Sequence, residues 1–467
     1  MSADFSAESG GEIVAPDFSS VEQHKLPVLT CSIVVGLLAG LLGTLFQLAI
    51  GWAEAGLKAL QGQSLAAGLP GWLLPAAGSA LLAWGAIKLV RYLAPEAAGS
   101  GIHEIEGALA GLRPVRWARV LPAKFFGGIM SLSAGLVLGR EGPTVQMGGN
   151  VGALVGRSFR MRDDEIHILL AAGAGAGIAA AFNAPLAGIL FVVEEMRSRF
   201  KYGFLSVQSV IIACGAATVV LRSIMAYLGE QPDIDMSLFS TPKQESLGLF
   251  LALGVMFGVI GYAFNATLVG TLDLYARLRG RLNRLRGLWI GGIVGALSAL
   301  HPHLVGGGYE TISWGLKIYW QPDPGGTIQL LLAVFAARFV AAMFSYGCGA
   351  PGGIFAPMLA LATLFGMAYG IAMEHWFAGL EIKAGMFAVA GMGALFAATV
   401  RAPLTGIALT IEMTQNYPLI LPLILTCWGA TIVAQGLGAR PIYSVLLERT
   451  LRAAGTSQQT PSSNIAP

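Results

Sequence analysis

One glutamate stands at the centre of a motif that this chain contains twice. Residues 139–143 read Gly-Arg-Glu-Gly-Pro, and residues 353–357 repeat the Gly-x-x-x-Pro frame as Gly-Ile-Phe-Ala-Pro. Glu141 is the central residue of the first copy, and Phe355 takes its place in the second. A carboxylate within a lipid-compatible sequence is costly, and such residues usually mark the path of an ion or a proton. Glu141 is therefore the first candidate functional residue.

Glycine-rich turns that lead into helices are the second chemical feature. Their backbone N–H groups, together with the helix dipole, favour a bound anion. Ser100 adds a hydroxyl that can donate to a bare halide, and Ile354 and Phe355 add backbone donors. A cation site would instead need rings of carboxylates or carbonyls. The turns of this kind are residues 99–102, 139–143 and 353–357.

The position of Glu141 within such a turn provides a simple exchange mechanism. When the carboxylate is ionised, it can occupy the anion site itself. When it is protonated, it leaves the site and admits the anion. The ionised carboxylate and the anion therefore compete for one site, and protonation of Glu141 decides which of them occupies it. This is the minimal requirement for proton–anion exchange.

The composition places these motifs in a membrane protein. Of the 467 residues, 55% are hydrophobic and only 12% are charged, against about 25% charged in soluble domains. Residues 166–193, 339–373 and 413–439 contain no Asp, Glu, Lys or Arg. Each of these stretches exceeds the roughly 20 residues that cross a bilayer core. We therefore expect an all-α polytopic membrane protein.

Many of the apolar segments are short or interrupted by Gly or Pro. Such segments in corresponding halves of a chain are typical of broken helices that line a central site. They lie near residues 28–52, 72–93, 117–138, 144–158, 166–195, 204–227, 246–272, 288–300, 327–346, 354–373, 384–398, 402–414 and 418–437.

The repeat extends well beyond the first motif. Residues 173–188 recur as 391–406, and the basic-aromatic pair Lys124-Phe125 recurs as Arg338-Phe339. Whether the two halves are parallel or inverted cannot be read from the repeat itself. The predicted organisation is residues 1–27, an N-terminal segment; 28–227, the first membrane repeat; 228–245, a loop; 246–440, the second membrane repeat; and 441–467, a C-terminal segment with no soluble regulatory domain.

Differences between the two halves indicate function better than agreements do. Glu194 aligns with Glu412, so we interpret Glu194 as structural, satisfying backbone groups at a helix end. Glu195, Ser100 and Glu141 align with Met, Gly and Phe, respectively. Three polar groups that only the first half carries predict one asymmetric pathway within a repeated frame.

The distribution of charge and the spacing of cysteine and histidine residues exclude several classes of function. Arginine-rich linkers at residues 113–119, 197–201 and 277–286 are predicted to be cytoplasmic by the positive-inside rule. We also expect both termini in the cytoplasm. The four cysteines and six histidines show no ligand spacing, and no nucleophile–base pattern appears. We therefore expect no enzyme, no metal, no cofactor other than the transported ions, and no nucleic-acid partner.

These motifs, in this order, resemble the CLC family of chloride channels and proton/chloride antiporters, and most closely its bacterial antiporters. The resemblance covers about residues 28–452. The motifs that carry it are GSGIHEIEGAL at 99–109, GREGPTVQMGG at 139–149, NAPLAGILFVVEEM at 183–196, GAPGGIFAPMLAL at 349–361 and a late Tyr443.

The resemblance implies a proton-coupled chloride antiporter of the cell (inner) membrane. It implies a homodimer with one pathway per subunit, and two inverted repeats of broken, tilted helices. Glu141 would be the external gate and Glu195 the internal proton glutamate. The implied chloride ligands are the side chains of Ser100 and Tyr443 and the backbone N–H groups of Ile354 and Phe355.

Other functions stay open at this point. A passive chloride channel on the same fold is the main alternative, and Glu195 favours the antiporter because many channels of the family lack it. Relatives selective for nitrate or fluoride resemble this pattern with Pro or Met in place of Ser100, so Ser100 favours chloride. One departure is His103, which replaces the proline of the usual GSGIP and adds a titratable ring beside Ser100.

Each candidate residue also has a purely structural interpretation. Glu141 can form a buried ion pair with Arg140, and Glu195 can end a helix near basic side chains. Tyr443 can belong to an interfacial aromatic belt, and Ser100 can be only a turn residue.

Overall fold

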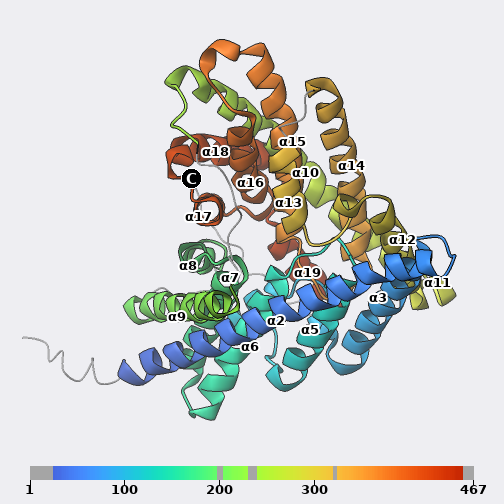
Figure 1. Cartoon of the computed structure of the whole chain (residues 1–467). Coiled ribbons are helices and arrows are strands. Elements are labelled where there is room, and N and C mark those ends of the chain that lie inside the picture. Colours follow the sequence, from blue (N-terminus) through green and yellow to red (C-terminus); the bar gives the residue numbers. More distant parts are fainter. Residues whose placement is uncertain (1–24, 197–202, 230–238, 319–322, 456–467) are drawn as a thin grey trace, which may run out of the picture.

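The computed structural model describes residues 25–196, 203–229, 239–318 and 323–455. These parts of the chain are helical and contain no strand. Eight of their helices are long and apolar enough to cross a membrane. The predicted all-α polytopic architecture is therefore confirmed (Figure 1). The arginine-rich linker at 197–201 lies outside the described residues.

The helices of the first half are α2 (Leu26–Ala66), α3 (Leu73–Leu93), α4 (Ile102–Leu109), α5 (Trp117–Ser133), α6 (Glu141–Ser158), α7 (Asp163–Phe182), α8 (Pro185–Glu194) and α9 (Phe204–Leu228). Those of the second half are α10 (Leu247–Arg277), α11 (Gly280–Arg284), α12 (Arg286–Leu300), α13 (Tyr309–Lys317), α14 (Pro324–Gly347), α15 (Phe355–Trp376), α16 (Ala384–Val400), α17 (Pro403–Thr414) and α18 (Ile420–Gly436). Helix α19 (Ile442–Ala453) follows in the C-terminal segment.

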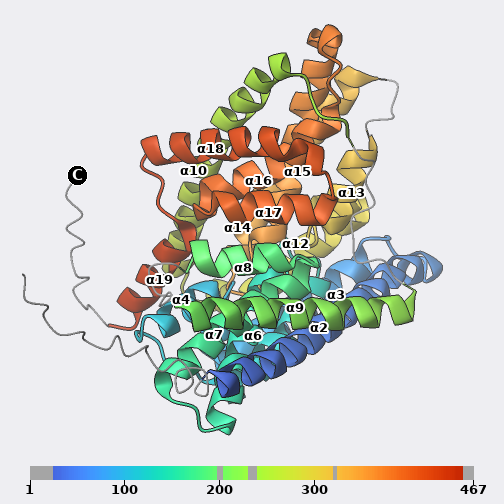
Figure 2. The same cartoon turned by 90° about the vertical axis from the view of Figure 1, so that its left-hand side faces the viewer.

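Helices of the two halves pack in matching ways. Helix α6 packs on α7 and α15 on α16, while α2 packs on α9 and α10 on α18. Helices α8 and α17 run side by side where the two halves meet (Figure 2). The last helix, α19, lies against α4 of the first half. This crossing brings the C-terminal part of the chain to the first glycine-rich turn.

Small residues allow the central helices to approach closely. A Cβ atom added to Gly148 of α6 would lie 2.1 Å from the carbonyl oxygen of Gly173 in α7. One added to Gly152 would lie 2.1 Å from the carbonyl oxygen of Leu169. Helices in membranes pack by such close approach because no hydrophobic force drives them together there.

The apolar segment near 166–195 is two helices rather than one. Helix α7 ends at Phe182, Asn183 has a left-handed backbone with φ of 56°, and α8 begins at Pro185. The break occurs because the residue before a proline avoids the helical conformation. The second half breaks in the same way at Arg401, before Pro403. Both halves of the chain therefore break a helix at the corresponding position.

Candidate functional site

Backbone hydrogen bonds join the glycine-rich turns of the two halves. The N–H groups of Gly139 and Gly353 each donate to the carbonyl oxygen of the other at 2.7 Å. The N–H of Gly352 donates to the carbonyl oxygen of Gly99 at 2.9 Å. The start of α6, the start of α15 and the turn ahead of α4 therefore meet at one place. These are the three turns that the sequence predicts to favour an anion.

The turn ahead of α4 has a counterpart ahead of α13. Gly99 and Gly101 have φ of 63° and 85°, and Gly306 and Gly308 have φ of 79° and 117°. Glycine adopts these left-handed conformations without the steric cost of a Cβ atom. The two turns thus share a backbone conformation, with Gly307 as the glycine that aligns with Ser100.

A buried cation holds each of these two turns. The Nζ atom of Lys124 donates to the carbonyl oxygen of Gly99 at 2.7 Å. The guanidinium of Arg338 donates to the carbonyl oxygens of Val305 and Gly306 at 2.6 and 2.5 Å. Both cations are fully buried, and a buried charge requires such partners. The basic residue of the repeated basic-aromatic pair thus fixes the turn of its own half.

Glu141 begins α6, and its carboxylate is fully buried at the start of α15. Its Oε2 accepts from the backbone N–H of Ala356 at 3.4 Å, and its Oε1 accepts from the hydroxyl of Tyr309 at 3.1 Å. Arg140 instead donates to the carbonyl oxygen of Ala181 at 3.1 Å. Within the described part of the chain, no ion pair joins Arg140 to Glu141. Arg140 acts electrostatically on Glu141 from a distance, and its direct hydrogen bond goes to Ala181 instead.

The predicted backbone donors adjoin this carboxylate. Ile354 is the N-cap of α15 and Phe355 its first residue, and both are buried. Amides at these positions have no partner within their own helix. The backbone amide that reaches Glu141 from this helix is that of Ala356, one residue further along, which the sequence analysis did not single out.

Ser100 and Tyr443 contribute two buried hydroxyls. Both residues are fully buried, and neither hydroxyl has a hydrogen-bond partner among the described residues. Buried polar groups are nearly always paired, so two unpaired hydroxyls require an explanation. A Cβ atom added to Gly142 would lie 2.5 Å from Ser100 Oγ, which places Ser100 against the Glu141 turn. The Tyr443 hydroxyl lies close to the side chain of Ser100.

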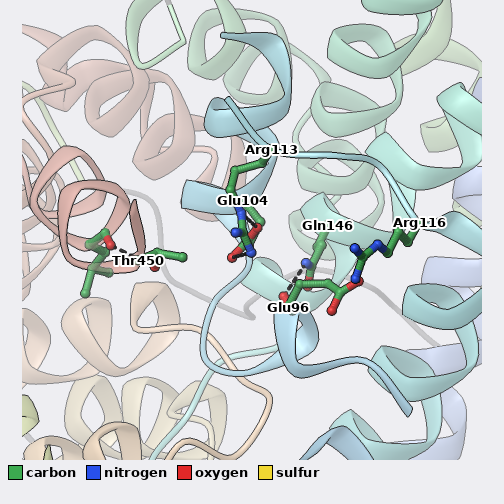
Figure 3. A network of polar contacts seen from close by, with 7 residues as sticks. Glu96, Glu104, Arg113, Arg116, Gln146 and Thr450 are labelled. Carbon is green, nitrogen blue, oxygen red and sulfur yellow. Dashed lines mark hydrogen bonds and ion pairs between the residues drawn. The ribbon is translucent and has the colours of Figure 1, made fainter. Parts of the chain in front are cut away.

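A polar network anchors α4, the short helix that follows Ser100 (Figure 3). The carboxylate of Glu104 accepts two hydrogen bonds from the Arg113 guanidinium, at 2.8 and 3.1 Å. The side-chain amide of Gln146, in α6, donates to the carbonyl oxygen of Glu96 at 2.8 Å. The first contact ties α4 to the loop that follows it. The second ties α6 to the segment that precedes Ser100.

Glu195 lies directly after α8 and is half-buried. It acts electrostatically on Tyr443, whereas Glu141 hydrogen-bonds Tyr309. The two candidate glutamates therefore have different neighbours. The structure brings Glu141, Ser100 and the start of α15 together, with Tyr443 near Ser100.

His103 lies in the first turn of α4 and is nearly buried. Lys124 and Arg113 are the charged groups that act on its ring. Two cations repel a charged imidazole, and burial adds to that cost. The surroundings therefore disfavour a charged His103 beside the site.

A cavity of about 1220 Å³ reaches this site from one side. Gly139, Arg140 and Tyr309 line it, and so do Lys58 and Glu310, which form an exposed ion pair at 2.6 Å. Tyr309 is not among the residues predicted from the sequence. The sequence does place it directly after residues 306–308, the counterpart of the Ser100 turn, and that position indicates a role at the site. Among the described residues no group of His, Cys, Asp or Glu is arranged to hold a metal ion.

Comparison with known proteins identifies the family. The voltage gated chloride channel family matches residues 80–435. The H(+)/Cl(-) exchange transporter ClcA of Vibrio cholerae is 50% identical over 450 residues, which cover 96% of this chain and 94% of that protein. ClcA of Cronobacter sakazakii is 49% identical over 92% of this chain and 91% of its own length.

A solved structure agrees with this match. The crystal structure of a slow cyanobacterial Cl-/H+ antiporter has a TM-score of 0.86 and 42% sequence identity to this chain. The alignment covers 92% of this chain and 99% of the antiporter. This chain, with its broken helices, thus has the fold of that antiporter. The chain belongs to the voltage gated chloride channel family, the CLC family that its motifs resemble.

Proposed function

We propose that this protein exchanges chloride for protons across a membrane. One observation carries the proposal: the Glu141 carboxylate accepts from the Ala356 N–H at the start of α15. A carboxylate in that position occupies the place where helix N-termini favour an anion. Protonation removes its charge, so the gate opens to chloride only when Glu141 carries a proton.

We assign the remaining roles on the same basis. Glu195 passes protons on the side of the site away from Glu141. The unpaired hydroxyls of Ser100 and Tyr443 donate to chloride, since a halide needs directed donors and offers none itself. The other proposed chloride ligands are the backbone N–H groups of Ile354 and Phe355.

A passive chloride channel is the second candidate, because the family description covers channels. The relatives favour exchange, since they are H(+)/Cl(-) exchange transporters and a Cl-/H+ antiporter. The glutamate at position 195 favours exchange as well, since a channel has no need of an internal proton acceptor.

We further propose the setting in which the exchange occurs. The protein spans the inner membrane as a homodimer, with both termini in the cytoplasm and repeats at 28–227 and 246–440. Large apolar side chains are exposed along α18, where only lipid or a second subunit can cover them in a membrane. They are Ile420, Leu421, Ile424, Trp428 and Ile432.

Reconstitution into liposomes tests the exchange. A chloride gradient is imposed across liposomes whose lipid membrane is impermeable to protons, and the external pH is recorded. An antiporter drives protons uphill against their own gradient as chloride runs down. Chloride flux without uphill proton movement identifies the passive channel and rejects the proposal. Empty liposomes are the control for leakage.

A further inference from the structure

Tyr309 makes the side-chain hydrogen bond to the Glu141 carboxylate. Its hydroxyl oxygen lies 3.1 Å from Glu141 Oε1 and 3.4 Å from the carbonyl oxygen of Ala181. No other side chain in the described residues hydrogen-bonds this carboxylate. A hydroxyl has a single proton to donate, so these two acceptors compete for it. An ionised carboxylate is the stronger acceptor, so the bond to Glu141 dominates while Glu141 is charged.

The surroundings of Tyr309 fix the direction of its hydroxyl. The guanidinium carbon of Arg140 lies 4.3 Å from the centroid of the Tyr309 ring, which is a cation–π contact. The ring of Phe182 packs at a centroid distance of 6.2 Å. Arg140 is itself held by the carbonyl oxygen of Ala181. The ring is therefore positioned by its neighbours, independently of the bond to Glu141.

The repeat explains why Tyr309 reaches the gate. Tyr309 directly follows residues 306–308, just as Ile102 directly follows residues 99–101. Arg338 holds the carbonyl groups of the later turn, as Lys124 holds those of the earlier one. The first turn supplies a hydroxyl from Ser100, within the turn itself. The second turn has no side chain at that position and supplies a hydroxyl from the residue that follows it.

We propose that Tyr309 is a positioning residue for the Glu141 gate. Its hydroxyl donates to the ionised carboxylate and stabilises the closed state, in which the carboxylate occupies the anion site. The inference rests on the proposed function only in taking Glu141 as the group that competes with chloride. Removal of the hydroxyl weakens that competition, so chloride binds more tightly.

Tyr309→Phe tests this, because it removes one oxygen and keeps the ring between Arg140 and Phe182. Chloride affinity is measured by isothermal titration calorimetry on the purified full chain in detergent at neutral pH. A hydrogen bond to a charged group corresponds to an affinity change of roughly tenfold, and we expect chloride binding to tighten by about that factor. Tyr369→Phe is the matched control, since its hydroxyl donates to the carbonyl oxygen of Leu249 and, among the described residues, makes no bond to Glu141.

The same substitution in a Glu141→Ala background separates positioning from a general effect on the site. With no carboxylate to hold, Tyr309→Phe should leave chloride affinity unchanged. The inference is supported if Tyr309→Phe tightens chloride binding by about threefold or more when Glu141 is present and leaves it unchanged in the Glu141→Ala protein. A change of about threefold exceeds ordinary errors of additivity. Any other combination overturns it. Chloride binding is measured without proton flux, so a failure of proton exchange in liposomes would leave this result readable.

Discussion

Glu194 and Glu412 each cap the first turn of the helix that carries the other. The Glu194 carboxylate accepts backbone N–H bonds at 3.1 and 2.8 Å from α17. The Glu412 carboxylate accepts them at 3.0 and 2.8 Å from α8. Negative charge at a helix N-terminus satisfies unpaired N–H groups and interacts favourably with the helix dipole. The interpretation of Glu194 as a structural residue, drawn from its alignment with Glu412, is confirmed.

This reciprocity predicts opposite phenotypes for two adjacent glutamates. Glu194→Gln keeps one acceptor oxygen but loses the charge, so we expect a loss of about 1 kcal/mol in stability, as for a weakened helix cap. Glu195→Gln should keep the stability and stop proton movement while chloride binding persists. Thermal unfolding and liposome proton flux measure the two effects. If Glu194→Gln uncoupled transport and Glu195→Gln did not, the use of repeat asymmetry to find functional residues would be wrong.

Glu141→Gln should abolish proton coupling and preserve chloride flux. The amide is nearly the same size as the protonated carboxyl group and carries no charge, so it mimics the open gate but cannot release a proton. Liposome flux with simultaneous pH recording measures both ions. Uphill proton movement driven by a chloride gradient in this variant would remove Glu141 from the proton path.

The parts of the site that can be predicted from the sequence are those specified by short motifs of neighbouring residues. Glycine turns and helix starts are local properties, so residues 99–102, 139–143 and 353–357 could be identified without a structure. The repeat alone does not establish that these turns meet at one point. The hydrogen bonds between Gly139 and Gly353 in the structure do. The roles of Ser100 and Tyr443 stay predictions, because they depend on a bound ion.

Other features escaped prediction for physical reasons. Helices α4, α13 and α19 carry charged residues and are short, so a search for long apolar segments does not detect them. Tyr309 is distant in sequence from Glu141, and only tertiary packing brings its hydroxyl to the carboxylate. The donor amide of Ala356 depends on where α15 starts, and helix boundaries are uncertain by one or two residues in sequence reasoning.

Ser100→Pro should shift anion preference from chloride towards nitrate. Proline removes the hydroxyl, and a bare halide depends more on a directed donor than a polyatomic anion does. It also removes the Ser100 N–H, which donates to the Tyr346 hydroxyl at 3.4 Å. Ser100→Ala is the matched control, since it removes the hydroxyl alone. Flux is compared for the two anions, and an unchanged chloride-to-nitrate ratio in both variants would exclude Ser100 from selectivity.

His103→Pro should leave the pH dependence of chloride binding unchanged. A charged imidazole beside Ser100 would attract the anion, and binding would then strengthen as pH falls. The ring, however, is nearly buried and faces the positive charges of Lys124 and Arg113, which oppose its protonation. Proline also suits this position, because N–H groups in the first helical turn have no intrahelical partner to lose. Chloride affinity measured from about pH 5 to about pH 8, where an ordinary imidazole titrates, compares the two proteins. A rise in affinity at low pH that His103→Pro abolishes would make His103 a proton sensor and contradict this expectation.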